Sequence, residues 1–183
     1  MPALQHVGRL AAVVAGALLA SGCVTVLEGT PSPSPVAATP CPVLEETGAL
    51  LSDRLVDVRI ESDATADRIV FILGERSTAP TDPNGRLMAV SPPFFAGASG
   101  IEVKVAGGRF VEIRMTGMLL VDETGTPAYD GPGEFAPELS VLKALVSVDQ
   151  FEGHSAWIAG YVGSGCVSLD ASGPGSFVVS FAH

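Results

Sequence analysis

The sequence predicts an all-β protein: an antiparallel β-sandwich of about nine short strands behind a signal peptide and a proline-rich tether. Three observations support this prediction. The chain is 47% hydrophobic and only 16% charged, so it has a core to bury. Short alternating or β-branched runs recur over residues 43–183, and turn-forming residues separate most of them. That stretch is long enough for one domain and too short for two.

Residues 1–22 have the pattern of an export signal. Arg9 gives a positive start, residues 10–20 are an apolar run, and Ser21 and Gly22 are small residues before Cys23. Residues 19–23, Leu-Ala-Ser-Gly-Cys, resemble the lipobox of bacterial lipoproteins, which implies cleavage before Cys23 and diacylation of its thiol. The alternative is an uncleaved anchor, because residues 10–27 carry no charge. Both alternatives place the domain on the extracytoplasmic face of the cell membrane.

The segment after Cys23 is expected to be a tether. Residues 23–42 contain five prolines among Thr, Ser and Ala, a composition that favours an extended polyproline conformation over a packed core. At about 3 Å per residue, the tether would hold the domain up to roughly 50 Å from the bilayer. The β-domain is expected to cover residues 43–183.

The charge of the mature chain restricts its partners. Without residues 1–22 the chain has 9 basic and 20 acidic side chains, a net charge of −11. Nucleic acid is therefore excluded as a partner, and the chain has no basic patch for anionic lipid. The expected partners are the membrane, through the lipid anchor, and a cell-wall polymer or envelope protein. The protein is expected to be a monomer.

The strands are expected in the following order along the chain. Residues 55–60 alternate apolar and polar, residues 68–73 are β-branched and aromatic, and Asp63-Ala64-Thr65 supplies the turn between them. Further strands are predicted at 86–90, 101–105, 110–116, 144–148, 155–162, 166–169 and 177–181. Pro83-Asn84-Gly85, Ala106-Gly107-Gly108 and Gly173-Pro174-Gly175 are predicted breaks. Residues 137–144 form either two turns of helix or a connection across one end of the sandwich.

Three motifs resemble those of a known family. They are Asp-Arg-Ile-Val-Phe at 67–71, Asp-Gln-Phe-Glu-Gly at 149–153 with Trp157 and Gly160 after it, and Val-Val-Ser-Phe-Ala-His at 178–183. Together they resemble the AMIN-like domain of actinobacterial lipoproteins over residues 52–183. The resemblance implies a β-sandwich related to AMIN domains, which help localise cell-wall amidases and envelope secretion machinery. It brings no established catalytic residues.

The chain departs from that family pattern at two places. Residues 81–85 read Thr-Asp-Pro-Asn-Gly where the family often has Pro-Gly-Tyr, and Ser176 and Ser180 replace the usual Arg and Asp of the last strand. Any binding role of those family side chains is therefore not carried over.

Cys41 and Cys166 are predicted to form a disulfide, because they are a pair of cysteines in an oxidising compartment. The alternative is two isolated thiols. A metal site at these cysteines is disfavoured, because no Cys-x-x-Cys or His-x-Cys spacing accompanies them. No cofactor is expected.

Aromatic residues in an expected loop are the candidate binding surface. Phe94 and Phe95 follow Pro92-Pro93, and two adjacent rings on an extended chain cannot both face inward. One ring is therefore expected to be exposed, and the alternative is that both rings cap the core. Trp157, in contrast, lies in a strand pattern and is expected to pack between the sheets.

An acidic stretch is a further candidate for chemistry. Asp122, Glu123, Asp130 and Glu134 lie in a Gly- and Pro-rich stretch, 122–134, that could hold calcium or supply paired carboxylates for hydrolysis. The calcium-loop pattern fails, because the twelfth place counted from Asp122 is Gly133, so a solvated acidic loop is the simpler interpretation.

A serine hydrolase would need His154 or His183 as its base. Gly163-Ser164-Gly165 is not a nucleophile elbow and is better explained as a hairpin turn. We therefore expect a non-enzymatic binding or scaffolding module of the cell envelope, with an extracytoplasmic hydrolase or calcium-binding module as the alternative. Converging carboxylates or His154 in one pocket would favour the hydrolase, and an exposed edge strand or aromatic loop would favour the binding module.

Overall fold

The computed structural model describes Cys41, residues 45–97 and residues 99–183. The predicted signal peptide, Cys23 and nearly all of the tether lie outside these residues. Residues Thr39–His183 form one compact unit. Its described part is all-β, with twelve strands in antiparallel sheets and no helix, which confirms the predicted fold class. Consequently, no helix in the described part is long and apolar enough to cross a membrane.

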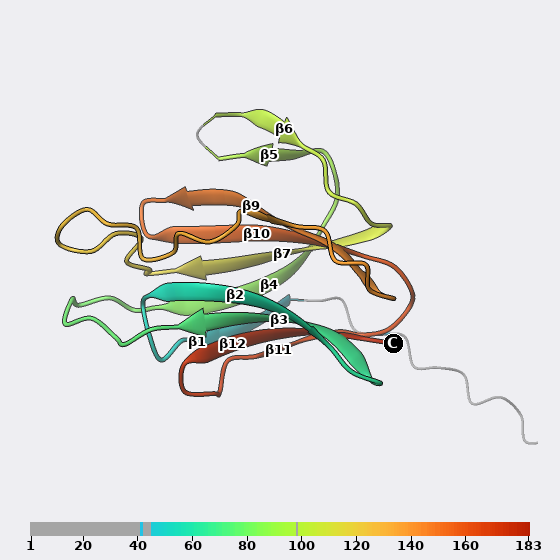
Figure 1. The fold of residues 1–183 in the computed structure, drawn as a ribbon, viewed down its shortest axis with the longest axis horizontal. Coiled ribbons are helices and arrows are strands. Elements are labelled where there is room, and N and C mark those ends of the chain that lie inside the picture. Colours follow the sequence, from blue (N-terminus) through green and yellow to red (C-terminus); the bar gives the residue numbers. More distant parts are fainter. Residues whose placement is uncertain (1–40, 42–44, 98) are drawn as a thin grey trace, which may run out of the picture. The chain divides into compact units, whose positions relative to one another are not determined.

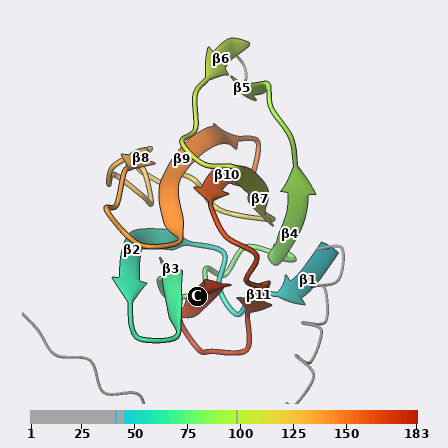
Figure 2. The same ribbon diagram turned by 90° about the vertical axis from the view of Figure 1, so that its right-hand side faces the viewer.

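Two sheets face one another, and a small hairpin lies beside them (Figure 1). The six-stranded sheet has the order β1 (Glu45–Ala49), β4 (Asn84–Val90), β7 (Arg109–Thr116), β10 (His154–Tyr161), β9 (Leu142–Phe151) and β8 (Glu134–Phe135). The four-stranded sheet has the order β11 (Val167–Asp170), β12 (Ser176–Ala182), β3 (Ala66–Leu73) and β2 (Leu55–Ser62). The hairpin consists of β5 (Phe94–Ala96) and β6 (Ile101–Val103), and it projects from the side of the six-stranded sheet in Figure 2.

The core lies between the two large sheets. Trp157 from β10 and Phe71, Phe177 and Phe181 from the four-stranded sheet are fully buried. The ring centroid of Phe71 lies 5.9 Å from that of Trp157 and 5.7 Å from that of Phe177. The prediction that Trp157 packs between the sheets is therefore confirmed. Rings this large exclude water from the interface and supply much of the hydrophobic stabilisation of the fold.

All nine predicted strands are present, and three further strands were missed. The β2–β3 hairpin has the expected antiparallel register, with Ile60 opposite Ile69, and its turn begins at Asp63. The missed strands are β1, β5 and β8. β1 is a polar edge strand with alternating exposed and half-buried residues, and β8 is two residues long, so neither has a marked hydrophobic pattern. β5 follows two prolines, which predict a loop.

The stretch 137–144 is not a helix, so the connection alternative is correct. Residues 136–141 have no regular structure and β9 begins at Leu142. The backbone amides of Val141 and Leu142 both donate to the carboxylate of Asp67, at 2.9 Å. These amides would bond to preceding carbonyls in a helix, so the carboxylate instead holds the chain extended at the entry to β9.

Two predicted turns are also corrected. Asn84 and Gly85 belong to β4, and a Cβ at Gly85 would lie 2.2 Å from a ring atom of Phe177. Gly85 therefore leaves room for the Phe177 ring, which occupies the space that a side chain at position 85 would need. Gly163-Ser164-Gly165 is not a hairpin turn, because β10 and β11 belong to different sheets and this segment crosses between them.

Candidate functional site

The β5–β6 hairpin forms an arm over the outer face of the six-stranded sheet (Figures 1 and 2). The amide of Gly97, just after β5, donates to the carbonyl of Val148 in β9 at 2.6 Å. Phe94 packs its ring against that of Phe110 in β7, with centroids 5.1 Å apart and planes at 65°. The arm is therefore fastened to the sheet by one backbone hydrogen bond and one aromatic contact.

The two adjacent phenylalanines face opposite ways, as predicted for an extended chain. Phe94 is buried, whereas Phe95 is 54% exposed. The burial of Phe94 leaves little of its ring for a partner, because most of the ring is covered by the molecule's own sheet. Phe95 is therefore the main candidate of the two for partner contact, and the alternative that both rings cap the core is wrong.

A groove of about 310 Å³ lies between the arm and the sheet. We call it the arm groove. Its apolar wall comes from the arm and from β4, β9 and β10, with Val90, Pro93, Phe94, Phe95, Val148 and Ile158. Three charged side chains complete it: Glu112 and Arg114 from β7, and Asp149 from β9. An apolar surface with a few polar groups is the usual composition of a binding site.

The charges in the arm groove are partly paired. Arg114 Nε donates to Glu112 Oε1 at 2.6 Å, and Glu112 is the less exposed partner, at 15% against 36% for Arg114. Among the described residues, no hydrogen bond is made by the two terminal guanidinium nitrogens of Arg114. These nitrogens remain able to donate to a bound carboxylate or hydroxyl.

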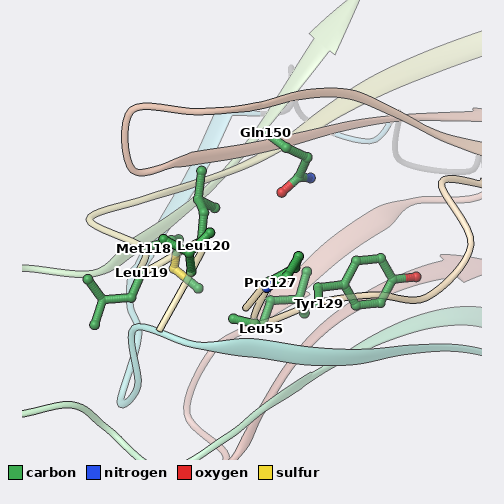
Figure 3. A pocket seen from close by; sticks show the side chains of 9 residues that line it. Leu55, Met118, Leu119, Leu120, Pro127, Tyr129 and Gln150 are labelled. Atoms are coloured by element: carbon green, nitrogen blue, oxygen red, sulfur yellow. The ribbon is translucent and has the colours of Figure 1, made fainter. Parts of the chain in front are cut away.

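A second pocket, of about 250 Å³, lies near the start of β2 and is shown in Figure 3. We call it the end pocket. The segment after β7 builds one wall by joining both sheets: the amide of Met118 donates to the carbonyl of Gly153, and that of Leu119 to the carbonyl of Asp53. Its lining is Leu55, Met118, Leu119, Leu120, Val121, Pro127, Ala128, Tyr129 and Gln150. These residues come from four separate segments, so no local sequence pattern predicted the pocket.

No three carboxylates of the acidic stretch 122–134 are gathered around one point in the described part of the chain. Asp122 folds onto its own loop, because its Oδ1 atom accepts hydrogen bonds from Thr124 and from the amide of Thr126. These hydrogen bonds hold the pKa of Asp122 below its ordinary value. Glu134 lies in β8, and within the described part of the chain no three His, Cys, Asp or Glu side chains gather around a metal-sized space.

Sequence reasoning gave no role to two buried carboxylates, Asp53 and Asp67, although Asp67 opens the first family motif. Donors such as Ser77 and Val141 lie far along the chain from the carboxylates that they bind. Asp53 accepts hydrogen bonds from the amide and hydroxyl of Ser77 and from the Thr81 hydroxyl. Burial raises the pKa of Asp53, but the bonds from Ser77 and Thr81 outweigh it and leave the pKa below its ordinary value. Both carboxylates are saturated by internal donors.

The C-terminal histidine lies near a serine and an aspartate but does not complete a catalytic relay. His183 Nε2 is 3.0 Å from Asp67 Oδ1 and 3.2 Å from Ser140 Oγ. A serine–histidine–aspartate triad uses one ring nitrogen for each partner, whereas here both partners share the same nitrogen. His154 makes no hydrogen bond to any described carboxylate, and its Nδ1 atom is buried without a partner.

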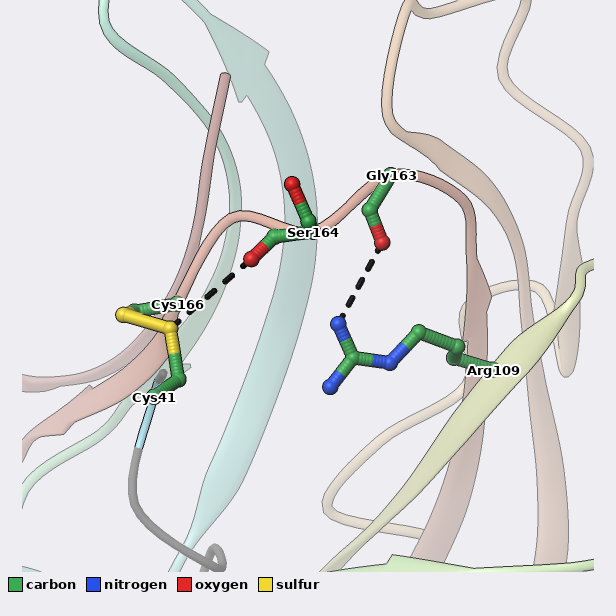
Figure 4. The surroundings of a disulfide bond; sticks show 5 residues. All are labelled: Cys41, Arg109, Gly163, Ser164 and Cys166. Carbon is green, nitrogen blue, oxygen red and sulfur yellow. Dashed lines mark hydrogen bonds between the residues drawn. A yellow bond between two sulfur atoms is a disulfide. The ribbon is translucent and has the colours of Figure 1, made fainter. Parts of the chain in front are cut away.

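The predicted disulfide between Cys41 and Cys166 is present, with a Cα–Cα distance of 5.3 Å (Figure 4). It joins Cys41, which precedes β1, to the segment that crosses between the sheets. Arg109 fixes the other end of this segment, since its guanidinium donates to the Gly163 carbonyl at 3.2 Å and lies over the Tyr161 ring.

Comparison with known proteins gives one match. The model of the AMIN-like domain family matches residues 53–183. No curated protein and no solved structure matches the chain.

Proposed function

Because the chain belongs to the AMIN-like domain family, we propose that it is a lipid-anchored actinobacterial lipoprotein whose domain binds a cell-wall polymer without catalysis. It would act as a monomer on the extracytoplasmic face of the cell membrane. The observation that carries the binding role is the exposed ring of Phe95 beside the arm groove. A lone aromatic ring held out by a folded arm contributes little to the core and is free for a partner.

The composition of the arm groove fits a polymer of sugars and short peptides. The face of an aromatic ring packs against the apolar face of a sugar, and carboxylates accept hydrogen bonds from hydroxyl groups. Glu112 and Asp149 would take this second role, and the free nitrogens of Arg114 would bind a peptide carboxylate. A polyanionic polymer is a poorer match, because the mature chain carries a net charge of −11.

The absence of catalysis is proposed from the arrangement of the titratable groups. Asp53 and Asp67 are occupied by internal donors, and His183 contacts its serine and aspartate through one nitrogen. Glu112 is paired with Arg114. A hydrolase acting on the same polymer would release soluble fragments from purified cell-wall sacculi, and that release would favour the hydrolase alternative.

Co-sedimentation with purified sacculi tests the binding role. Phe95→Ser is expected to weaken binding about tenfold or more, because a ring moved from water into a binding site contributes on the order of 2 kcal/mol. Ile101→Ser is the matched control: Ile101 is 68% exposed on the same arm but does not line the arm groove. Equal loss in both variants, or no sedimentation of the wild type, would contradict the proposal.

A protein partner is the other outcome of this test. If a photoreactive residue at position 95 crosslinks to one envelope protein and the protein does not bind sacculi, that protein replaces the polymer as the proposed partner.

The anchor is tested separately with Cys23→Ser, which removes the thiol that takes the lipid and should move the protein out of the detergent phase. A variant that still partitions into detergent would show an uncleaved N-terminal anchor instead.

A further inference from the structure

The arm groove contains two opposite charges with no ion pair between them. Arg114 lies in β7 and Asp149 in β9, and both line the groove. Only β10 separates these strands: Arg114 is opposite Ala156, and Ala156 is opposite Asp149. Trp157, the next residue, points into the core, so this row of side chains faces outward, toward the arm. Neighbouring strands lie about 4.8 Å apart, which places the Cα atoms of Arg114 and Asp149 about 10 Å apart.

Arg114 is fixed on one side of its guanidinium group and free on the other. Its Nε atom donates to Glu112 at 2.6 Å, whereas its two terminal nitrogens bond to no described residue. Arg86, which is opposite Arg114 in β4, is paired with Glu45. Each arginine of the row therefore already has one carboxylate. The terminal nitrogens of Arg114 remain as a planar fork, which matches the two oxygens of a ligand carboxylate.

Asp149 is a half-buried carboxylate without a counter-charge. It forms no ion pair or hydrogen bond within the described part of the chain. The arm lies against it, since a Cβ at Gly97 would be 2.7 Å from Asp149 Oδ1, and the hydrogen bond from Gly97 to Val148 fixes this approach. Lys104, which follows β6 in the arm, is paired with Glu102 and does not neutralise Asp149.

These two charges select among the parts of a cell-wall polymer. An uncharged sugar would displace water from Asp149 without supplying a positive charge. An anionic group alone would gain from Arg114 but would be repelled by Asp149 and Glu112. A segment that carries both signs of charge gives each group its opposite, and charge-assisted hydrogen bonds are the stronger ones.

From these charges and their spacing we propose that the arm groove recognises the peptide part of the polymer, through a diamino acid with a free side-chain amine and a free carboxylate. The ammonium group would lie on Asp149, whose second oxygen remains for a sugar hydroxyl, and the carboxylate on the fork of Arg114. In lysine these two groups are separated by about the length of two extended residues, roughly 7 Å. That length bridges side chains whose Cα atoms are about 10 Å apart. This inference rests on the proposed function and names the part of the polymer that is bound.

Three small probes test the two contacts separately. Nα-acetyl-lysine has both groups, Nα,Nε-diacetyl-lysine lacks the ammonium charge, and Nα-acetyl-lysine amide lacks the carboxylate. They are titrated by NMR into the full chain carrying Cys23→Ser. Each blocked probe is expected to bind about tenfold more weakly than Nα-acetyl-lysine, because it loses one charge-assisted contact. Equal binding of all three probes, or no binding of Nα-acetyl-lysine, would overturn the proposal.

Two variants assign each contact to its residue. In Asp149→Asn, acetylation of the side-chain amine should no longer matter, while loss of the carboxylate should still weaken binding about tenfold. Arg114→Gln should show the reverse pattern. Asp130→Asn is the matched control, because it removes one exposed negative charge outside the groove and should leave both preferences intact. If Asp130→Asn has the same effect as Asp149→Asn, net charge alone attracts the amine and the assignment is wrong.

Sacculi whose peptides have been removed by an amidase separate this inference from the proposed function. The wild type should sediment with intact sacculi and bind the peptide-free glycan strands at least tenfold more weakly. Equal binding to both would overturn the peptide assignment and leave binding of the polymer standing. Binding to neither would contradict both.

Discussion

Asp67 connects the two sheets through one carboxylate. It lies in β3 of the four-stranded sheet, and it accepts hydrogen bonds from Ser62 and from the amides of Val141 and Leu142, where β9 begins. His183, at the C-terminus, adds a fourth contact at 3.0 Å. Burial raises the pKa of Asp67, but these donors outweigh it and lower the pKa to about 2. The ionised carboxylate is therefore part of the folded structure.

Replacing Asp67 by Asn should destabilise the fold by about 3 kcal/mol at pH 7, because the buried amide of Leu142 and the partly buried amide of Val141 lose a charged acceptor. The lowered pKa also fixes the sign of the pH dependence. The stabilisation is complete above the ordinary pKa of 3.8 and is lost as the pH falls toward 2. Urea unfolding at pH 7, 4 and 2 should show the difference between wild type and variant shrinking by roughly 1–2 kcal/mol. Glu61→Gln, an exposed neighbour in β2, is the control, and an unchanged difference across this pH range would contradict the assignment.

Among the elements, the position of the arm depends on how closely the segment between β6 and β7 approaches the six-stranded sheet. A Cβ at Gly160 in β10 would lie 2.0 Å from the carbonyl oxygen of Ala106, in the segment between β6 and β7. No side chain fits at this position, because the obstacle is backbone and cannot rotate away. The arm is thus positioned by a glycine of the sheet it covers.

Gly160→Ala should therefore push this segment off the sheet and loosen the arm, at a cost of about 2 kcal/mol. Hydrogen exchange should rise in β5 and β6, while the amides of β2 and β3 should keep their protection. Gly108→Ala is the matched control, since a Cβ at Gly108 meets nothing within 4 Å. If exchange in the arm is the same in both variants, the contact with Ala106 does not hold the arm.

The same elements show what the sequence can predict. The nine recognised strands contain runs such as Arg68-Ile69-Val70-Phe71, where side-chain alternation and β-branching are local properties. β5 and its place in the arm were missed, because the arm is held by contacts made far along the chain, with Val148 and Phe110. The exposure of one phenylalanine followed from alternation alone, but which ring is exposed is decided by Phe110. Asp67 and Gln150 lie in quoted motifs, but the motifs do not indicate their contacts, because partners such as Leu142 and Ser155 lie in other strands.

At the scale of the whole molecule, the disulfide determines which residues transmit a mechanical force on the tether to the domain. Cys41 precedes β1 and is bonded to Cys166, 125 residues later. A load applied at the N-terminus therefore reaches the crossing segment before it reaches β1, a five-residue edge strand. Glu46 in β1 also accepts a hydrogen bond from the amide of Leu169 in β11 at 2.7 Å. This bond is a second link between β1 and the part of the chain that follows Cys166.

Pulling the protein by its two ends should show this load path directly. With the disulfide intact, the covalent loop between Cys41 and Cys166 cannot lengthen, and only the 17 residues after Cys166 can unravel, an extension of about 60 Å. After reduction, or in the Cys41→Ser, Cys166→Ser double variant, the whole domain should extend by about 500 Å, starting with β1. Single-molecule force spectroscopy with and without reductant measures both lengths. An oxidised protein that extends as far as the reduced one would mean that the disulfide is not formed in the purified protein, and the load would then pass through β1.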